Sequence, residues 1–83
     1  MGRAKQEPSL IFAQHLRAAR EARGVSQNQL AARTGIPQTM ISALENAKHL
    51  PSWQTLLACA DGLDVSIDFL MGRTKELRYA STS

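Results

Sequence analysis

Apolar side chains recur every third or fourth residue through several stretches of this chain, the spacing that places them on one face of an α-helix. The first such stretch carries Leu10, Phe12, Leu16 and Ala19. Proline is favoured in the first turn of a helix and glycine just after the last, so Pro8 and Gly24 bracket this stretch. The pattern predicts a first helix over about residues 10–23.

Residues 26–46, SQNQLAARTGIPQTMISALEN, hold two shorter stretches of the same kind. Ser26 and Gln29 form an S-x-x-Q capping box, in which each side chain satisfies an amide group at the start of a helix. A second helix is therefore predicted over about residues 27–34.

Gly35 stands where the chain must turn sharply with a left-handed backbone, and the small Ala31 leaves room for a neighbouring backbone. A third helix is predicted to begin near Pro37. The apolar positions that face each other across this corner are Leu30, Ile36, Ile41 and Leu44. Two short helices joined at a glycine in this way predict a helix-turn-helix.

Two further helices are predicted after the corner. Ser52 caps a helix with four apolar positions, Trp53, Leu56, Leu57 and Ala60, which is expected to end at Gly62. Ser66 caps a short last helix, Ile67–Met71, before Gly72. Five helices and no strand predict a single all-α domain over residues 9–72. Residues 1–8 are expected to form a flexible N-terminal arm, and residues 73–83 a loose polar tail.

Composition narrows the class of protein. The chain has 83 residues and a net charge of +3, and no apolar run is long enough to span a membrane. No signal sequence precedes the first helix, and the lone Cys59 suits a reducing compartment, so a cytoplasmic protein is expected. No Cys/His cluster has the spacing of a zinc site, and neither a cofactor nor an enzymatic activity is indicated.

The charge is unevenly distributed along the chain. Up to Gly35 six Lys/Arg face two Glu, a balance of +4, and from Ile36 onward four Lys/Arg face five Asp/Glu, a balance of −1. A basic half of this kind is suited to phosphates, although a mild excess of one sign is more often an ordinary solvated face.

The third predicted helix carries the candidate chemistry. Met40, Ile41 and Leu44 are expected to face the core. The opposite face holds small or polar uncharged side chains, Gln38, Thr39, Ser42, Ala43 and Asn46. Such a face fits the major groove of DNA, where amides pair with adenine and methyl groups contact thymine. The simpler alternative is that this is the solvent-exposed face of a helical bundle. The capping box and the glycine turn between the two helices favour a DNA-binding face over that alternative.

Residues 12–72 resemble the phage-repressor and Cro family of helix-turn-helix domains, often called the XRE family. The most specific matching pieces are SQNQLAARTGI, the LEN of residues 44–46, the pair Pro51-Ser52 and the ending LDVSIDFLMG. The resemblance implies a five-helix lambda-repressor-like bundle and a sequence-specific regulator of transcription that binds double-stranded DNA.

The resemblance also implies individual roles. Gln38 would contact a base, adenine by preference, and the other base-facing residues would be Thr39, Ser42 and Ala43. Gln27 would hold a DNA phosphate and brace Gln38, while Asn46 and Lys48 would grip the DNA backbone. Arg20 would form a structural ion pair with Glu45, and is also expected near a phosphate.

Three positions depart from the family pattern. Pro37 replaces the usual Ser or Thr cap and supplies no capping oxygen. Ala47 stands where glycine is usual, and Thr34 where an aliphatic side chain is common. None of these removes an expected DNA contact outright.

Several other side chains are assigned simple roles. Cys59 is expected to be buried by packing and not to act as a redox sensor. Solvent exposure is expected for His15 and His49, with an incidental phosphate contact as a further role for His49. Trp53 is expected in the core or at its rim.

The late apolar cluster leaves two interpretations open. Phe69, Leu70 and Met71, with Tyr79 as a possible fourth member, would form a homodimer interface that presents two third helices to a palindromic operator. Alternatively, Phe69 and Leu70 close the core of one chain. A repressor acting as a homodimer is the first function predicted. The second is a protein-interaction module, such as an antitoxin or the partner of an anti-repressor.

Overall fold

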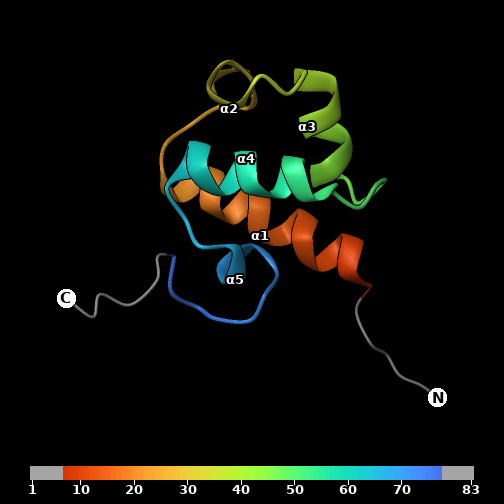
Figure 1. Ribbon diagram of the computed structural model, residues 1–83, viewed down its shortest axis with the longest axis vertical. Helices are drawn as coiled ribbons and strands as arrows, with labels where there is room; N and C mark the ends of the chain where they lie inside the picture. Colours follow the sequence, from red (N-terminus) through yellow and green to blue (C-terminus); the bar gives the residue numbers. More distant parts are fainter. Residues whose placement is uncertain (1–6, 78–83) are drawn as a thin grey trace.

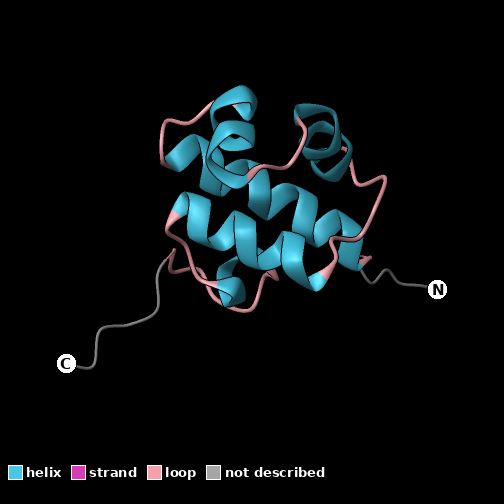
Figure 2. Ribbon diagram, turned by 45° about the horizontal axis from the view of Figure 1, so that its top comes forward, coloured by secondary structure: helices cyan, strands magenta, loops and turns pink. Residues whose placement is uncertain are grey.

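The computed structural model describes residues 7–77, which form five α-helices joined by loops (Figures 1 and 2). The helices are α1 (Pro8–Ala22), α2 (Gln27–Thr34), α3 (Gln38–Glu45), α4 (Trp53–Leu63) and α5 (Ile67–Leu70). No strand occurs between residues 7 and 77. The all-α fold with five helices, including the helix-turn-helix pair, is therefore confirmed.

The helices pack so that α2 and α3 form a unit on top of a longer helix pair. Helix α1 packs against α3 and α5, and α2 packs against both α3 and α4. Figure 1 places α2 and α3 on one side of the α1 and α4 layer and α5 on the other. The core contains apolar residues of all five helices, among them Phe12, Leu16, Leu30, Ile41, Leu44, Cys59, Leu63 and Leu70. The helix-turn-helix is thus fixed from below by packing.

The first helix begins at the proline expected to start it, whereas the predicted end of α4 is wrong. Helix α1 begins at Pro8, so the expected arm is shorter by that residue, and residues 1–6 of the arm lie outside the described part of the chain. Gly62 does not end α4, which continues to Leu63 and closes at Asp64 with a φ of 54°. A Cβ atom on Gly62 would lie 2.8 Å from Cγ2 of Thr34 on α2. Glycine is needed here for close approach of two helices, not as a stop.

The segment after α5 turns back onto the domain. The Ser66 N–H donates a 2.6 Å hydrogen bond to the carbonyl oxygen of Leu77, and the half-buried Leu77 packs against the core. The expectation of a loose tail is therefore wrong for residues 73–77, because an apolar side chain anchors their end. Residues 78–83, including Tyr79, lie outside the described part.

Large apolar side chains remain exposed around the start of α4. Leu50 is 60% exposed and Trp53 is 64% exposed, whereas Leu56 is buried. The expectation of Trp53 in the core or at its rim is wrong, because α4 begins beyond the edge of the buried cluster. Among residues 7–77, no helix has the length and apolar character needed to cross a membrane.

Candidate nucleic-acid interface

The corner between α2 and α3 is built as its sequence indicates. The Ser26 Oγ accepts the Gln29 N–H at 3.0 Å, and the Gln29 Oε1 accepts the Ser26 N–H at 2.8 Å. Gly35 then turns with a φ of 77° and donates its N–H to the Ala31 carbonyl oxygen at 2.9 Å. The predicted capping box and left-handed glycine are both confirmed, and they fix the direction in which the chain enters α3.

Thr34 contributes to the same corner with its hydroxyl group. Its Oγ1 donates to the Leu30 carbonyl oxygen at 2.8 Å and accepts the Ile36 N–H at 3.1 Å. An aliphatic side chain makes neither bond. Pro37 stands before α3 without a side-chain cap, and its carbonyl oxygen accepts the Met40 and Ile41 N–H groups at 2.9 and 3.1 Å. Helix α3 therefore starts cleanly at Gln38.

Helix α3 buries one face and leaves the other accessible. Ile41, Leu44 and Glu45 are buried. The predicted base-facing residues remain accessible: Thr39 is exposed, and Gln38, Ser42 and Ala43 are half-buried. Met40 was expected in the core but is 40% exposed, because the inner face of so short a helix is already filled by Ile41 and Leu44.

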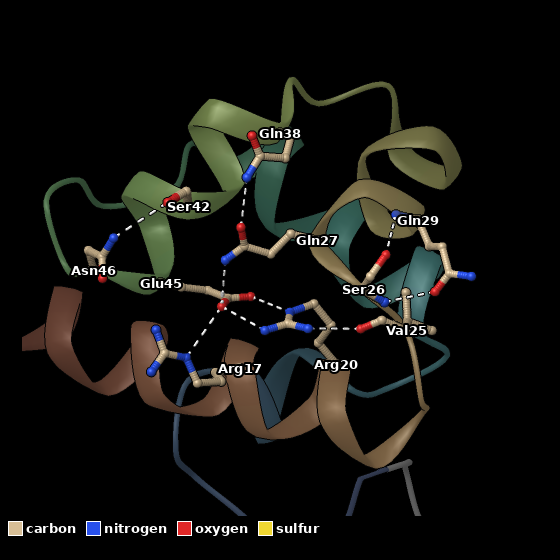
Figure 3. A network of polar contacts seen from close by, with 10 residues as sticks. All are labelled: Arg17, Arg20, Val25, Ser26, Gln27, Gln29, Gln38, Ser42, Glu45 and Asn46. Carbon is tan, nitrogen blue, oxygen red and sulfur yellow. Dashed lines mark hydrogen bonds and ion pairs between the residues drawn. The ribbon is translucent and has the colours of Figure 1, made fainter.

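A series of hydrogen-bonded polar side chains connects α1 through α2 to the accessible face of α3 (Figure 3). The Arg20 guanidinium donates to both carboxylate oxygens of Glu45, through Nε at 2.7 Å and through Nη2 at 3.1 Å. The Gln27 Nε2 donates to Glu45 Oε1 at 3.0 Å. The Gln38 Nε2 in turn donates to Gln27 Oε1 at 2.8 Å. The structure thus brings together four of the predicted site residues.

The Glu45 side chain has no solvent exposure, and the surrounding donors determine its charge. Burial by itself raises the pKa of Glu45, but the hydrogen bonds from Arg20, Gln27 and Arg17 outweigh it, so the pKa lies below the usual value. The hydrogen bond to Glu45 raises the pKa of Arg20, against a smaller effect of burial. The pair is therefore ionised at neutral pH.

Arg17 is a member of this network that was not predicted from the sequence. Its Nε lies 3.4 Å from Glu45 Oε1, and its side chain is 50% exposed. The signal was present in the sequence, since Arg17 precedes Arg20 by three residues and therefore shares its helical face. Glu45 thus accepts hydrogen bonds from both α1 arginines.

Two further arginines of the basic half, Arg23 and Arg33, hold helices together. Arg23 donates to the carbonyl oxygens of Leu63 and Asp64 at 2.9 and 2.7 Å, and Arg33 donates to that of Gly62 at 3.0 Å. These carbonyl groups lie at the C-terminal end of α4, where cations are stabilising. The +4 balance up to Gly35 therefore overstates the charge available for DNA phosphates.

The loop after α3 carries the expected backbone-gripping residues. Asn46 and Lys48 are exposed, and Asn46 Nδ2 lies 3.5 Å from Ser42 Oγ. Ala47 has a φ of 61°, a left-handed conformation that an alanine adopts at a cost. The Lys48 N–H donates to the Ala43 carbonyl oxygen at 3.0 Å and closes the helix end. Ala47 thus adopts the backbone conformation that glycine adopts most readily.

Comparison with known proteins identifies the family to which these features belong. Residues 16–70 match the family described as helix-turn-helix. The chain belongs to this family.

Proteins with similar sequences are named as regulators of transcription. This helix-turn-helix chain is 44% identical to the uncharacterized HTH-type transcriptional regulator y4dL of Sinorhizobium fredii, over 65% of this chain and 28% of the relative. It is 39% identical to the cryptic phage CTXphi transcriptional repressor RstR of Vibrio cholerae, over 65% of this chain and 48% of the relative. The chain thus spans half the length of these relatives or less.

The fold also matches solved structures. The restriction-modification controller protein C.AhdI from Aeromonas hydrophila is 31% identical with a TM-score of 0.71, over 75% of this chain and 94% of that chain. An HTH_3 family transcriptional regulator from Vibrio cholerae is 28% identical with a TM-score of 0.74, over 78% and 36% of the two chains.

The late apolar cluster of this helix-turn-helix protein closes its own core. Leu70 is 0% exposed and Phe69 is 9% exposed. Both belong to the core and α5 packs against α1 and α4, so the structure favours the second interpretation, in which Phe69 and Leu70 close the core of one chain. Met71 is half-buried and keeps some accessible surface.

The cysteine and the two histidines were also assigned roles from the sequence. Cys59 is buried, as predicted, and burial raises the pKa of its thiol to about 11. His49 is exposed as expected, but His15 is half-buried. His15 Nδ1 lies 2.8 Å from the Ile11 carbonyl oxygen, and its ring meets that of Phe69 edge-on. Residues 7–77 contain no group of three side chains suited to a metal ion.

Proposed function

We propose that this chain binds double-stranded DNA sequence-specifically and regulates transcription, with α3 lying in the major groove. The observation that carries the proposal is the position of Gln38. Its amide lies on the accessible face of α3, at a corner fixed by capping and packing, and it is braced by Gln27 at 2.8 Å. A braced amide is suited to bidentate pairing with adenine, since its geometry is set before DNA arrives.

The other contacts follow from the same placement. Thr39, Ser42 and Ala43 would line the groove beside Gln38, and each is at least partly accessible. Lys48 and Asn46 would contact phosphates, with Gln27 at the other end of the helix pair. Arg20 is less available than these residues for contact with a phosphate. Three of its five N–H donors are bound to Glu45 and Val25, and two remain.

A repressor that acts as a homodimer on a palindromic operator is the finer form of this proposal. It is supported by the similarity to the repressor RstR. A two-fold dimer would place two α3 helices about 34–36 Å apart, one turn of DNA. Among the described residues of the predicted interface set, Met71 keeps accessible surface. Sedimentation of the protein alone and on DNA measures the stoichiometry, and binding of one chain per site contradicts the dimer.

The proposal is tested by selecting bound sequences from a random duplex pool and then comparing variants on the selected site. Gln38→Ala is expected to stay folded and to lose the preference for that site over random duplex. The matched control is Gln54→Ala, at an exposed position of α4. A preference unchanged by Gln38→Ala contradicts the assignment of Gln38 to a base.

The phosphate assignment has its own measurement, the dependence of affinity on salt. Lys48→Ala is expected to weaken binding to all sequences and to lower the salt slope by about 1. Lys75→Ala, at an exposed position after α5, is the control and should leave the slope unchanged. An equal effect of both variants contradicts a specific role for Lys48.

A protein-interaction module is the competing function. The exposed Leu50 and Trp53 favour it, because exposed apolar side chains of this size are typical of binding surfaces. Stoichiometric capture of a protein partner, together with the absence of any salt-sensitive shift of DNA, would support this function and contradict the first.

A further inference from the structure

A buried charge is connected to the accessible Gln38 amide by one intervening side chain. Glu45 lies at the inner end of this line, Gln27 in the middle and Gln38 at the outer end (Figure 3). The two joining hydrogen bonds are 3.0 Å, from Gln27 Nε2 to Glu45 Oε1, and 2.8 Å, from Gln38 Nε2 to Gln27 Oε1. We call these three residues the amide relay.

The inner end of the amide relay accepts hydrogen bonds and cannot donate them. An ionised carboxylate has no proton to give, and the groups bound to Glu45 from Arg17, Arg20 and Gln27 are all donors. Gln27 must therefore turn its NH₂ group toward Glu45. A reversed Gln27 would place its carbonyl oxygen against a buried negative charge.

This constraint passes outward to Gln38. With its NH₂ group toward Glu45, Gln27 presents a carbonyl oxygen to α3, and that oxygen accepts only a donor. Gln38 must then turn its Nε2 toward Gln27, because a reversed amide would bring two carbonyl oxygens together. One Nε2 hydrogen of Gln38 is used in this way. The second Nε2 hydrogen and the Oε1 acceptor remain for DNA.

We infer that Glu45 is a positioning residue that acts through Gln27 to fix the orientation of the Gln38 amide and thereby its preference for adenine over guanine. This rests on the proposed function, in which Gln38 lies in the major groove. Adenine offers one acceptor and one donor there, which match the free donor and acceptor of the fixed amide. Guanine offers two acceptors, which the Gln38 oxygen opposes.

The relay predicts that freeing the Gln38 amide broadens recognition instead of abolishing it. An unconstrained glutamine can rotate its NH₂ group toward the guanine oxygen. Discrimination between the two purines then falls, while contact with the groove remains. A purely structural role for Glu45 predicts a different result, in which affinity for all duplexes falls together.

The test uses the full chain and two duplexes: the site selected from a random pool by the wild-type protein, and the same site with its Gln38-dependent A·T pair changed to G·C. The pair is found as the one whose change no longer matters in Gln38→Ala. The ratio of the two dissociation constants is measured for Gln27→Met and Glu45→Gln. Gln54→Met, at an exposed position of α4, is the matched control.

The relay predicts that Gln27→Met and Glu45→Gln each reduce the adenine-to-guanine ratio about fivefold or more, since one bidentate pair is worth about this much discrimination or more. Gln54→Met should leave the ratio unchanged. A wild-type ratio in Gln27→Met overturns the inference. If no pair loses its effect in Gln38→Ala, the assignment of Gln38 to a base under the proposed function has failed, which is a separate outcome.

A second measurement covers the case in which Glu45→Gln fails to fold. The side-chain amide signals of Gln27 and Gln38 are recorded in the free ¹⁵N-labelled protein. The relay predicts that Gln27→Met shifts the Gln38 side-chain signal and speeds its exchange with solvent, while backbone amide signals of α3 stay in place. A Gln38 signal that is unaffected by Gln27→Met overturns the inference without any DNA.

Discussion

Arg20 on α1 holds the buried Glu45 carboxylate at the end of α3, with hydrogen bonds of 2.7 and 3.1 Å to its two oxygens. The same guanidinium donates to the Val25 carbonyl oxygen at 2.9 Å, in the loop before α2. One side chain therefore links three segments that must keep their relative positions if α3 is to be presented to DNA.

Removal of Arg20 should leave the Glu45 charge buried and short of partners. Arg20→Met is expected to lower the free energy of unfolding by about 3 kcal/mol, the lower end of the range for broken buried pairs because Arg17 and Gln27 remain. The double variant Arg20→Met/Glu45→Leu should be more stable than Arg20→Met, since it removes the stranded charge as well. Urea unfolding measures both.

Arg73 and Asp68 supply the matched control for this measurement. Their atoms lie 3.7 Å apart, and their side chains are 77% and 51% exposed. Arg73→Met should change the free energy of unfolding by less than about 1 kcal/mol, as is usual for surface pairs. Equal losses in Arg20→Met and Arg73→Met would contradict a special role for the buried pair.

The lowered pKa of Glu45 predicts a pH dependence of stability. Above the ordinary glutamate value of 4.5, Glu45 is ionised in both the folded and the unfolded chain, and its full contribution is present. As the pH falls below that value, the unfolded chain takes up the proton first, so stability is lost until the folded carboxylate is also protonated.

The measurement is the difference in unfolding free energy between the wild-type protein and Glu45→Gln, taken as a function of pH. The difference should be constant near neutral pH and should shrink below about pH 4.5. Other carboxylates protonate equally in the two proteins and cancel. A difference that stays constant down to pH 3 would contradict the lowered pKa.

Local signals in the sequence were sufficient for most of the fold. Ser26 with Gln29, and Gly35 after Thr34, specify the ends of α2 through groups only a few residues apart. The accessible face of α3 also followed from spacing alone. These features are predictable because the interacting atoms belong to neighbouring residues on one helix.

Several errors arose at residues whose role depends on contact with another helix. Gly62 looks like a helix end in the sequence, but its role is set by Thr34 on α2. In the sequence, Arg23 was included in the positive charge available to DNA, but in the structure its guanidinium donates to carbonyl groups at the end of α4. For Phe69 the sequence left open a dimer interface or the core of one chain, because its burial depends on contact with α1. Such contacts have no local signature, so they required the three-dimensional arrangement.

The contact of Gly62 with α2 predicts an unusual effect of alanine. Replacement of glycine by alanine inside a helix ordinarily stabilises a protein by about 1 kcal/mol. Here the new Cβ would lie 2.8 Å from Thr34 Cγ2 and 3.3 Å from Leu30 Cδ1. Thr34 cannot rotate away without losing its two hydrogen bonds. Gly62→Ala is therefore expected to destabilise the protein, by about 1–2 kcal/mol as for overpacked cores.

A second substitution tests that explanation directly. Thr34→Ser removes the opposing methyl group and keeps the hydroxyl that bonds Leu30 and Ile36. The double variant Gly62→Ala/Thr34→Ser should recover most of the loss, measured as a favourable coupling energy in thermal or urea unfolding. Additive effects of the two substitutions would show that the methyl group is not the obstacle.

Ala47 predicts the opposite outcome for a glycine. Its φ of 61° is left-handed, which costs an alanine about 1–2 kcal/mol, while glycine adds about 0.4–1 kcal/mol of unfolded-chain entropy. Ala47→Gly should therefore raise the free energy of unfolding by about 0.5–1 kcal/mol. The same substitution at Ala18, inside α1 and exposed, should lower it by about 1 kcal/mol. Urea unfolding distinguishes these signs, and a loss of stability in Ala47→Gly would mean that the strain at this turn is relieved by contacts of the Ala47 methyl group.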